Sequence, residues 1–183
     1  MNRPEIECLA SRIVYRNRWM TVRQDRIRRR SGATGLYGVV DKPDFAVIAA
    51  VRDGRLLLVE QYRYPVGARL WELPQGAWED RPDADPALLA AGELREETGY
   101  AAASLVAAGS LFLACGYSSQ RYHIYLATGL SRVGRQLDAE EEGLAVADFS
   151  LAEVEEMMRT GRIVDATTVA ALGLLKLKGL LPL

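Results

Sequence analysis

Two apolar runs near the middle of the chain form its clearest pattern of hydrophobic and polar positions. Phe45–Val51 and Leu56–Gln61 are almost continuously apolar, and between them stands Asp53-Gly54, a pair that accepts positive φ at both positions. This pattern predicts a β-hairpin of two buried strands. Before it, residues 11–40 alternate apolar and polar positions in the manner of strands. We therefore expect a β-rich N-terminal piece followed by a buried hairpin.

A helix is predicted next, between an aspartate and a glycine. Asp85-Pro86 supplies an N-cap followed by proline at the first helical position, and Gly99 stands where a C-cap is expected. The helix would be roughly 13 residues long. Its last turns carry Glu93, Glu96 and Glu97, and side chains at i, i+3 and i+4 lie on one helix face. Such a row is either a solvated surface or a set of converging carboxylates that binds a hard divalent cation.

The second half of the chain contains further strand-like and helical segments. Three stretches predict strands, with a polar tip at residues 116–120 between the first two: Leu105–Ala114, Tyr122–Thr128 and Leu144–Phe149. Two stretches with apolar positions at helical spacing predict closing helices: Leu151–Thr160 and Ala166–Lys178. Strands interleaved with one central helix and followed by C-terminal helices predict an α+β fold, arranged as an α/β/α sandwich.

Composition excludes several classes of protein. The chain has 183 residues, 49% of them hydrophobic and 26% charged, as in ordinary globular domains. A net charge of -1 argues against nucleic-acid binding, and no apolar stretch approaches the length of a membrane span. Cys8 and Cys115 have neither a disulfide nor a metal-ligand spacing, so both are expected to be free thiols. We expect a cytoplasmic protein with no membrane partner.

The segment Trp71–Tyr100 resembles the Nudix box, whose pattern is G-x5-E-x7-R-E-U-x-E-E-x-G-U with U an aliphatic residue. Gly76 matches the opening glycine, and Glu93–Tyr100 (ELREETGY) matches the second half of the pattern. The resemblance identifies the glutamates as metal ligands and favours the converging carboxylates over a solvated helix face.

The front half of the box departs from the pattern. From Gly76 to Glu93 is 17 positions where the pattern has 15, so the loop before the helix is two residues longer. The first glutamate of the pattern would fall on Pro82 counted forwards, or on Ala84 counted backwards. Gly92 stands at the position of the arginine that, in the family, helps hold the glutamates in place.

A wider resemblance, over about residues 12–178, points to the ADP-ribose pyrophosphatase branch of the Nudix hydrolases. It is carried by RNRWMTVRQDRIR, by AVIAAVRDGRLLLVEQYRYPVGARLWELPQG and by GRIVDATTVAALGLL. The resemblance implies a Nudix fold with a mixed central sheet, built from an N-terminal β-rich dimerisation segment (residues 1–42) and a hydrolase domain (residues 43–183) in a homodimer. It also implies magnesium-dependent cleavage of the pyrophosphate bond of a nucleoside diphosphate linked to another moiety, with ADP-ribose or a related ADP-sugar as the first candidate.

The family pattern assigns the metal ligands. Magnesium prefers oxygen ligands and typically takes one or two carboxylates together with substrate phosphates and water. Glu93 and Glu97 suit that role with Glu96 assisting, and the backbone carbonyl of Gln75 would be a further ligand. Manganese could replace magnesium.

In this branch the general base often comes from an acidic loop ahead of the last strand, here residues 137–143. Glu140 is favoured as the group that takes a proton from metal-bound water, with Glu141 and Glu142 as alternatives. Like-charged neighbours would raise the pKa of such a glutamate. A solvated acidic loop with no catalytic role is the competing interpretation.

Three residues are candidates for substrate binding. Arg63 has the planar fork that suits phosphate oxygens, and Glu72 either contacts the substrate or forms a structural salt bridge. Gln120 stands where the branch has a glutamate, and Cys115 stands where it has a proline. These departures leave open a GDP- or UDP-sugar as substrate, and the altered box leaves open a catalytically weak nucleotide-binding protein.

Overall fold

The computed structural model describes residues 4–135 and 142–181. Within it the chain forms two compact units. The first contains the described residues up to Asp44 together with Phe112–Arg121, and the second contains Phe45–Leu111 and the described residues from Tyr122 onwards. Each unit is described by itself.

The first unit is a three-stranded antiparallel sheet in the order β1-β2-β3. Its strands are β1 (Ile6–Arg16), β2 (Thr21–Arg29) and β3 (Thr34–Asp41). The β-rich N-terminal piece is therefore confirmed, although β1 begins earlier than the alternation at residue 11 suggested. The early residues pair through the backbone and through an ion pair of 2.8 Å between Glu7 and Arg28, and because all of Ile6–Ala10 except Glu7 are apolar, this stretch shows no alternation.

The second unit is built on a seven-stranded mixed sheet in the order β10-β5-β4-β9-β8. β4 runs parallel to β9 and antiparallel to β5, while short β6 pairs with β5 and short β7 with β4. The hairpin between β4 and β5 turns at Asp53 (φ 52°) and Gly54 (φ 73°), as predicted. The strands are β4 (Phe45–Arg52), β5 (Arg55–Arg63), β6 (Ala68–Glu72), β7 (Gln75–Gly76), β8 (Tyr100–Phe112), β9 (Arg121–Arg132) and β10 (Ala145–Ser150).

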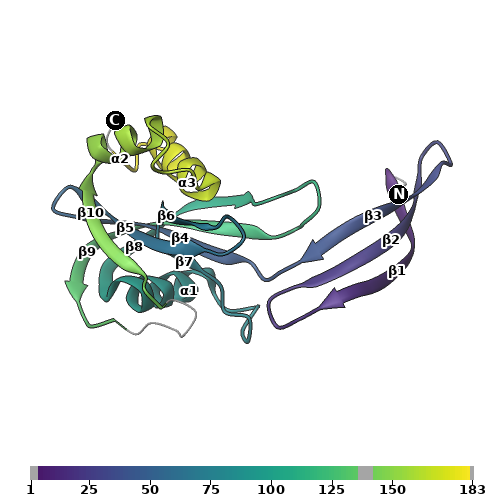
Figure 1. Ribbon diagram of the computed structural model, residues 1–183, viewed down its shortest axis with the longest axis horizontal. Helices are drawn as coiled ribbons and strands as arrows, with labels where there is room; N and C mark the ends of the chain where they lie inside the picture. The colour runs from purple at the N-terminus through teal and green to yellow at the C-terminus, as the bar shows by residue number, and fades with distance from the viewer. Residues whose placement is uncertain (1–3, 136–141, 182–183) are drawn as a thin grey trace. The chain divides into compact units, whose positions relative to one another are not determined.

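Helices cover both faces of this sheet (Figure 1). Ala46, Ile48 and Ala50 of β4 pack with Leu89 and Leu94 of the central helix, which begins as α1 (Pro86–Glu93). The alternate residues of β4 pack on the opposite side, against α2 (Leu151–Arg159) and α3 (Ala166–Leu177). Burial of both faces explains why β4 is an uninterrupted apolar run. The α+β fold with helices on the two sides of a mixed sheet is confirmed.

The central helix has the predicted ends but not the predicted regularity. Asp85 caps its start by accepting a hydrogen bond of 2.8 Å from the Ala87 amide, and Gly99 ends it with φ 76°. Between them α1 passes into a single π-helical turn, η1 (Leu94–Thr98). Glu96 and Glu97 therefore lie in a widened turn and not in a continuous α-helix. Single π turns of this kind frequently occur at functional sites.

The segment before the central helix also differs from expectation. No strand was predicted between Gln61 and the helix, but Gln75 and Gly76 form β7, paired with Val47 and Ala46 of β4. A two-residue strand leaves no periodic pattern, so only its tertiary pairing reveals it. The adjacent Leu73 amide donates a hydrogen bond of 2.9 Å to the buried hydroxyl of Thr168 in α3. This stretch is thus fixed to the sheet on one side and to α3 on the other.

Both closing helices are capped at their first turn. Ser150 and Glu153 form a reciprocal capping box at the start of α2, and Asp165 accepts a hydrogen bond of 2.8 Å from the Thr168 amide at the start of α3. Across the described residues, no helix combines the length and the apolarity needed to cross a membrane.

Candidate active site

Two of the three predicted glutamates converge on β7. Glu93 and Glu97 are 5% and 2% exposed, whereas Glu96 is only partly buried. The Glu97 carboxylate accepts a hydrogen bond of 2.9 Å from the Gln75 amide, and the Glu93 carboxylate lies against the Cα of Gly76. The interpretation of these glutamates as a solvated helix face therefore fails for Glu93 and Glu97.

Gly76 is required by this packing and not by its backbone angles. A Cβ added at Gly76 would lie 2.2 Å from Oε2 and 2.9 Å from Oε1 of Glu93. Any side chain at this position would push the carboxylate out of its place. The opening glycine of the box is therefore the residue that admits a buried glutamate against β7.

A salt bridge extends the site beyond the central helix. The guanidinium of Arg63, at the end of β5, makes a two-point contact with the carboxylate of Glu72, and its Nε lies 2.8 Å from Oε1. Gln75 Nε2 donates a hydrogen bond of 2.7 Å to the same carboxylate, which is 1% exposed. Glu72 thus forms the structural salt bridge that was one of its two predicted roles. The contact places the predicted phosphate-binding arginine next to the glutamate site.

The electrostatics of this group keep Arg63 charged. Burial acts to lower the pKa of Arg63, but the hydrogen bonds and charge of Glu72, with further contributions from Glu97 and Asp165, raise that pKa above its ordinary value. The site therefore combines three buried carboxylates, on Glu72, Glu93 and Glu97, with one permanent cation.

The residues at β7 fit a hard divalent cation. No three His, Cys, Asp or Glu side chains within residues 4–135 and 142–181 form a group that could hold a metal ion by themselves. Magnesium does not need such a group, because it typically binds one or two carboxylates and completes its shell with water and substrate phosphates. Glu97, bonded to the Gln75 amide, and Glu93, packed on Gly76, supply carboxylates of that kind.

The remaining predicted residues are Gln120 and the glutamates of the acidic loop. Gln120 belongs to the first unit, where it is buried and its Nε2 donates a hydrogen bond of 2.6 Å to the Pro43 carbonyl. Glu140 and Glu141 lie outside the described residues, and Glu142 is exposed in a turn. The predicted general base therefore stays a prediction.

Arginines from β6 and from the segment after β9 bind the last residue of the acidic loop and the residue that follows it. Arg69 Nη2 donates a hydrogen bond of 2.8 Å to the Gly143 carbonyl, and Arg135 Nη2 donates one of 2.7 Å to the Leu144 carbonyl. The end of the acidic loop is thereby fixed to the second unit.

Sequence reasoning missed two residues that support the site. Thr168 holds the backbone at Leu73, and Trp78 packs directly against Gly92, the residue that replaces the arginine of the box. A threonine in an apolar helix gives no distinctive signal. Trp78 and Gly92 lie 14 positions apart, and only the fold shows that they are in contact.

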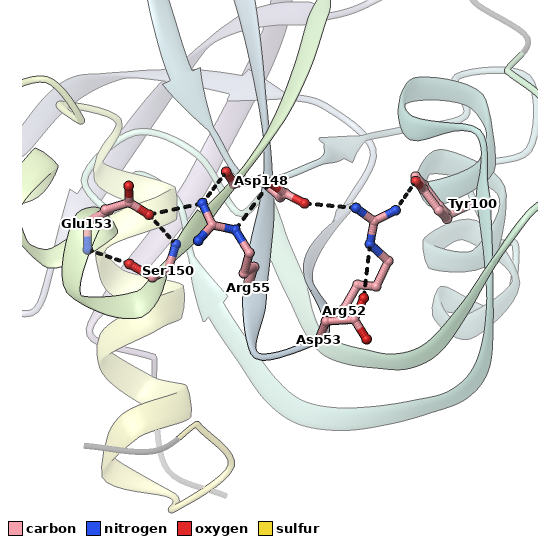
Figure 2. Close-up of polar contacts among 7 residues, drawn as sticks. All are labelled: Arg52, Asp53, Arg55, Tyr100, Asp148, Ser150 and Glu153. Carbon is pink, nitrogen blue, oxygen red and sulfur yellow. Dashed lines mark hydrogen bonds and ion pairs between the residues drawn. The ribbon is translucent and has the colours of Figure 1, made fainter.

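A second charged cluster lies at the opposite end of β4 (Figure 2). Asp148 of β10 bridges two arginines of the β4–β5 hairpin, at 2.8 Å from Arg52 Nη2 and 3.2 Å from Arg55 Nε. Arg52 also contacts the hydroxyl of Tyr100, and Arg55 reaches Glu153 at 3.1 Å. This cluster joins the hairpin, β10 and the start of α2, and we assign it to stability.

Asp148→Asn is expected to lower the free energy of unfolding by about 1–2 kcal/mol at pH 7. Burial acts to raise the pKa of Asp148, but Arg55 and Arg52 lower it below its ordinary value of 3.8. A depressed pKa means stability that is present above the ordinary value and lost as the pH falls through the folded-state value. The difference between wild type and variant in urea unfolding should therefore shrink below about pH 4.

Asp53→Asn on the same hairpin, 89% exposed, is the control and should change stability by less than about 0.5 kcal/mol. A difference that persists unchanged at pH 3 would contradict the charge argument.

Comparison with known proteins decides the family. The NUDIX domain model matches residues 42–172, which include the whole glutamate site. The chain belongs to the Nudix hydrolase family. A second model, the nucleoside diphosphate sugar hydrolase N-terminal domain, matches residues 6–40 of this Nudix hydrolase.

Individual relatives extend over most of the chain. The hydrolase is 34% identical over 168 residues to the ADP-ribose pyrophosphatase of Mycobacterium tuberculosis, covering 91% of this chain and 81% of that protein. It is also 34% identical over 171 residues to the CMP-5'-(N-acetyl-N-hydroxy-3-aminopropyl)phosphonate hydrolase of Streptomyces rubellomurinus, covering 92% and 80%. The crystal structure of an ADP compounds hydrolase has the same fold, with a TM-score of 0.85, 24% identity and coverage of 98% and 97%.

Proposed function

We propose that this Nudix hydrolase uses magnesium, replaceable by manganese, to cleave the pyrophosphate bond of a nucleoside diphosphate linked to another moiety, with ADP-ribose or a related ADP-sugar as substrate. The observation that carries the proposal is the pair of buried carboxylates, Glu93 and Glu97, placed against the Gln75–Gly76 backbone. The similarity to an ADP-ribose pyrophosphatase over 91% of the chain supports the choice of substrate.

Cleaving a pyrophosphate with water requires neutralised phosphate charge and an activated water. A bound magnesium ion would supply that charge neutralisation and lower the pKa of a water. Glu93 and Glu97 would hold it, with Glu96 and the Gln75 carbonyl as further oxygen donors. Arg63, kept charged by Glu72, would turn its remaining donors to a phosphate oxygen.

We assign proton removal from the attacking water to the acidic loop, with Glu140 as the first candidate and Glu141 as the second. The support is positional, because the arginine contacts at Gly143 and Leu144 fix the chain directly after these residues. Glu142, exposed in a turn, is the third candidate.

The finer part of the proposal is the identity of the substrate, that is, its nucleobase and the group linked to its diphosphate. One relative, 34% identical to this chain, is named as the hydrolase of a CMP-linked phosphonate, a substrate whose nucleobase is cytosine and not adenine. Gln120 in place of a glutamate removes one charge from the candidate substrate-binding residues. A GDP- or UDP-sugar is therefore the second candidate substrate.

We further propose that the protein is a homodimer whose dimerisation segment is residues 1–42. Its three-stranded sheet exposes large apolar side chains, including Ile13 (51%), Tyr15 (54%) and Leu36 (65%). Exposed apolar groups in such density mark interaction surfaces. Light scattering should give twice the 20.2 kDa chain mass, and a monomer at micromolar concentration would contradict this part of the proposal.

The exposed free thiols Cys8 and Cys115 favour a reducing compartment, and we propose the cytoplasm.

The substrate is tested by incubating the purified protein with magnesium and a panel of ADP-ribose, ADP-, GDP- and UDP-sugars, NADH and dinucleoside polyphosphates. We expect AMP and ribose 5-phosphate from ADP-ribose, and no product when the metal is removed with EDTA. A clear preference for a GDP- or UDP-sugar would move the assignment to the second candidate. Binding of these ligands with no hydrolysis of any of them would show a nucleotide-binding protein in place of an enzyme.

A further inference from the structure

The loop after β7 and the end of α1 interlock through two glycines. On one side, the Glu93 carboxylate of the helix lies on the Cα of Gly76. On the other side, the Trp78 indole of the loop lies on the Cα of Gly92: a Cβ added there would be 2.2 Å from Cζ2 and 3.0 Å from Cη2 of the ring. The loop thus contributes Gly76 and Trp78, and the helix contributes Gly92 and Glu93.

The tryptophan is held firmly in this contact. Trp78 packs against the apolar cluster that includes Leu89 and Leu94 of the central helix. The guanidinium of Arg81 stacks on the ring, 3.8 Å from its centroid, and the Arg81 amide donates a hydrogen bond of 3.1 Å to the Trp78 carbonyl. A ring packed against the core and stacked by a guanidinium has little room to move away from the backbone it touches.

The backbone it touches directly precedes Glu93. Position 92 is where the box pattern has the arginine that helps hold the glutamates in place, and Gly92 has no side chain for that task. The indole fills the space that a side chain at position 92 would need. Because Gly92 and Glu93 are adjacent, a displacement at Gly92 moves the carboxylate relative to β7.

We propose that Trp78 is a positioning residue that sets the Glu93 carboxylate against Gly76 through its contact with Gly92, and so replaces the missing arginine of the box. The inference rests on the proposed function for its consequence, because a correctly placed Glu93 is useful as a metal ligand. Trp78 would thus keep Glu93 in place although the box lacks its arginine.

The test is a double-mutant cycle read out by Mn²⁺ binding to the purified protein, followed by electron paramagnetic resonance without substrate. Gly92→Ala should weaken Mn²⁺ binding about tenfold or more, the range found when groups that orient metal ligands are changed. Trp78→Leu should also weaken it about tenfold. In the Trp78→Leu background, adding Gly92→Ala should change the affinity by less than about threefold, because the clash is gone.

Gly173→Ala is the matched control. Gly173 is also helical, and a Cβ added there meets nothing within 4 Å, so this variant should keep the wild-type Mn²⁺ affinity. Helix propensity by itself favours alanine at both positions, so a loss confined to Gly92→Ala isolates the contact with Trp78. If Gly92→Ala does not fold, the comparison of Trp78→Leu with the double variant decides.

Three results would overturn the inference: a Gly92→Ala variant with the affinity of Gly173→Ala, a Trp78→Leu variant with wild-type affinity, or an equal Gly92→Ala effect in both backgrounds. A wild-type protein that binds Mn²⁺ but hydrolyses no member of the substrate panel contradicts the proposed function alone. Active wild-type protein with no coupling between positions 78 and 92 contradicts the positioning role alone.

Discussion

Glu97→Gln is expected to lower kcat for the pyrophosphate substrate by about a thousandfold while the protein stays folded. The charge on the metal ligand is lost, and metal neutralisation of phosphate is worth several kcal/mol in the transition state. The fold should survive because the amide oxygen of the new side chain can still accept the hydrogen bond from Gln75, now made at 2.9 Å to Glu97. Steady-state kinetics with saturating magnesium, together with circular dichroism, measure both quantities.

Glu156→Gln is the matched control for this experiment. Glu156 is a helical glutamate on the surface of α2, 55% exposed, so its neutralisation should leave kcat unchanged. Near-normal activity of the Glu97→Gln protein would mean that the metal site has been placed on the wrong residues.

The second large effect is expected from Gly76→Ala, which adds one methyl group. That methyl group would lie 2.2 Å from Oε2 of Glu93, so the buried carboxylate or the β7 backbone must move by about 1 Å. Misplacement of this size costs on the order of a hundredfold in rate. We expect kcat/KM to fall by that factor and the magnesium concentration for half-maximal activity to rise.

Gly38→Ala controls for the general cost of alanine at a strand glycine. Gly38 lies in β3, and an added Cβ there meets nothing within 4 Å. The control should have wild-type kinetics. If Gly76→Ala also had wild-type kinetics, the contact between Gly76 and Glu93 would have no part in placing the metal ligand.

Much of the fold could be predicted because short stretches of sequence specify the hairpin and the ends of the helix. The β4–β5 hairpin followed from two apolar runs around a turn with two positive φ values, and the ends of the central helix followed from Asp85 and Gly99. The short β7 strand could not be predicted, since its two residues are strand only through pairing with β4. The π turn likewise leaves no mark in residue spacing.

The site was predicted in part for the same reason. The spacing of Glu93 and Glu97 placed both on one side of the helix, and the structure adds that this side is buried at β7. A structural salt bridge was one of two alternatives for Glu72, but Arg63 could not be named as its partner, because residues on neighbouring strands meet only once the register is known. The contact of Gly92 with Trp78 could not be predicted, since the sequence shows that the arginine is missing but not which side chain fills its space.

The central claim is that Glu93 and Glu97 bind the catalytic metal at β7. A crystal structure with Mn²⁺ and a non-hydrolysable analogue of ADP-ribose, with anomalous scattering to locate the ion, tests it most directly. The account predicts an anomalous peak about 2.1 Å from carboxylate oxygens of Glu93 and Glu97, with the Gln75 carbonyl and the analogue's phosphates completing the shell. A peak bound by other residues, with Glu93 and Glu97 taking no part, would contradict it.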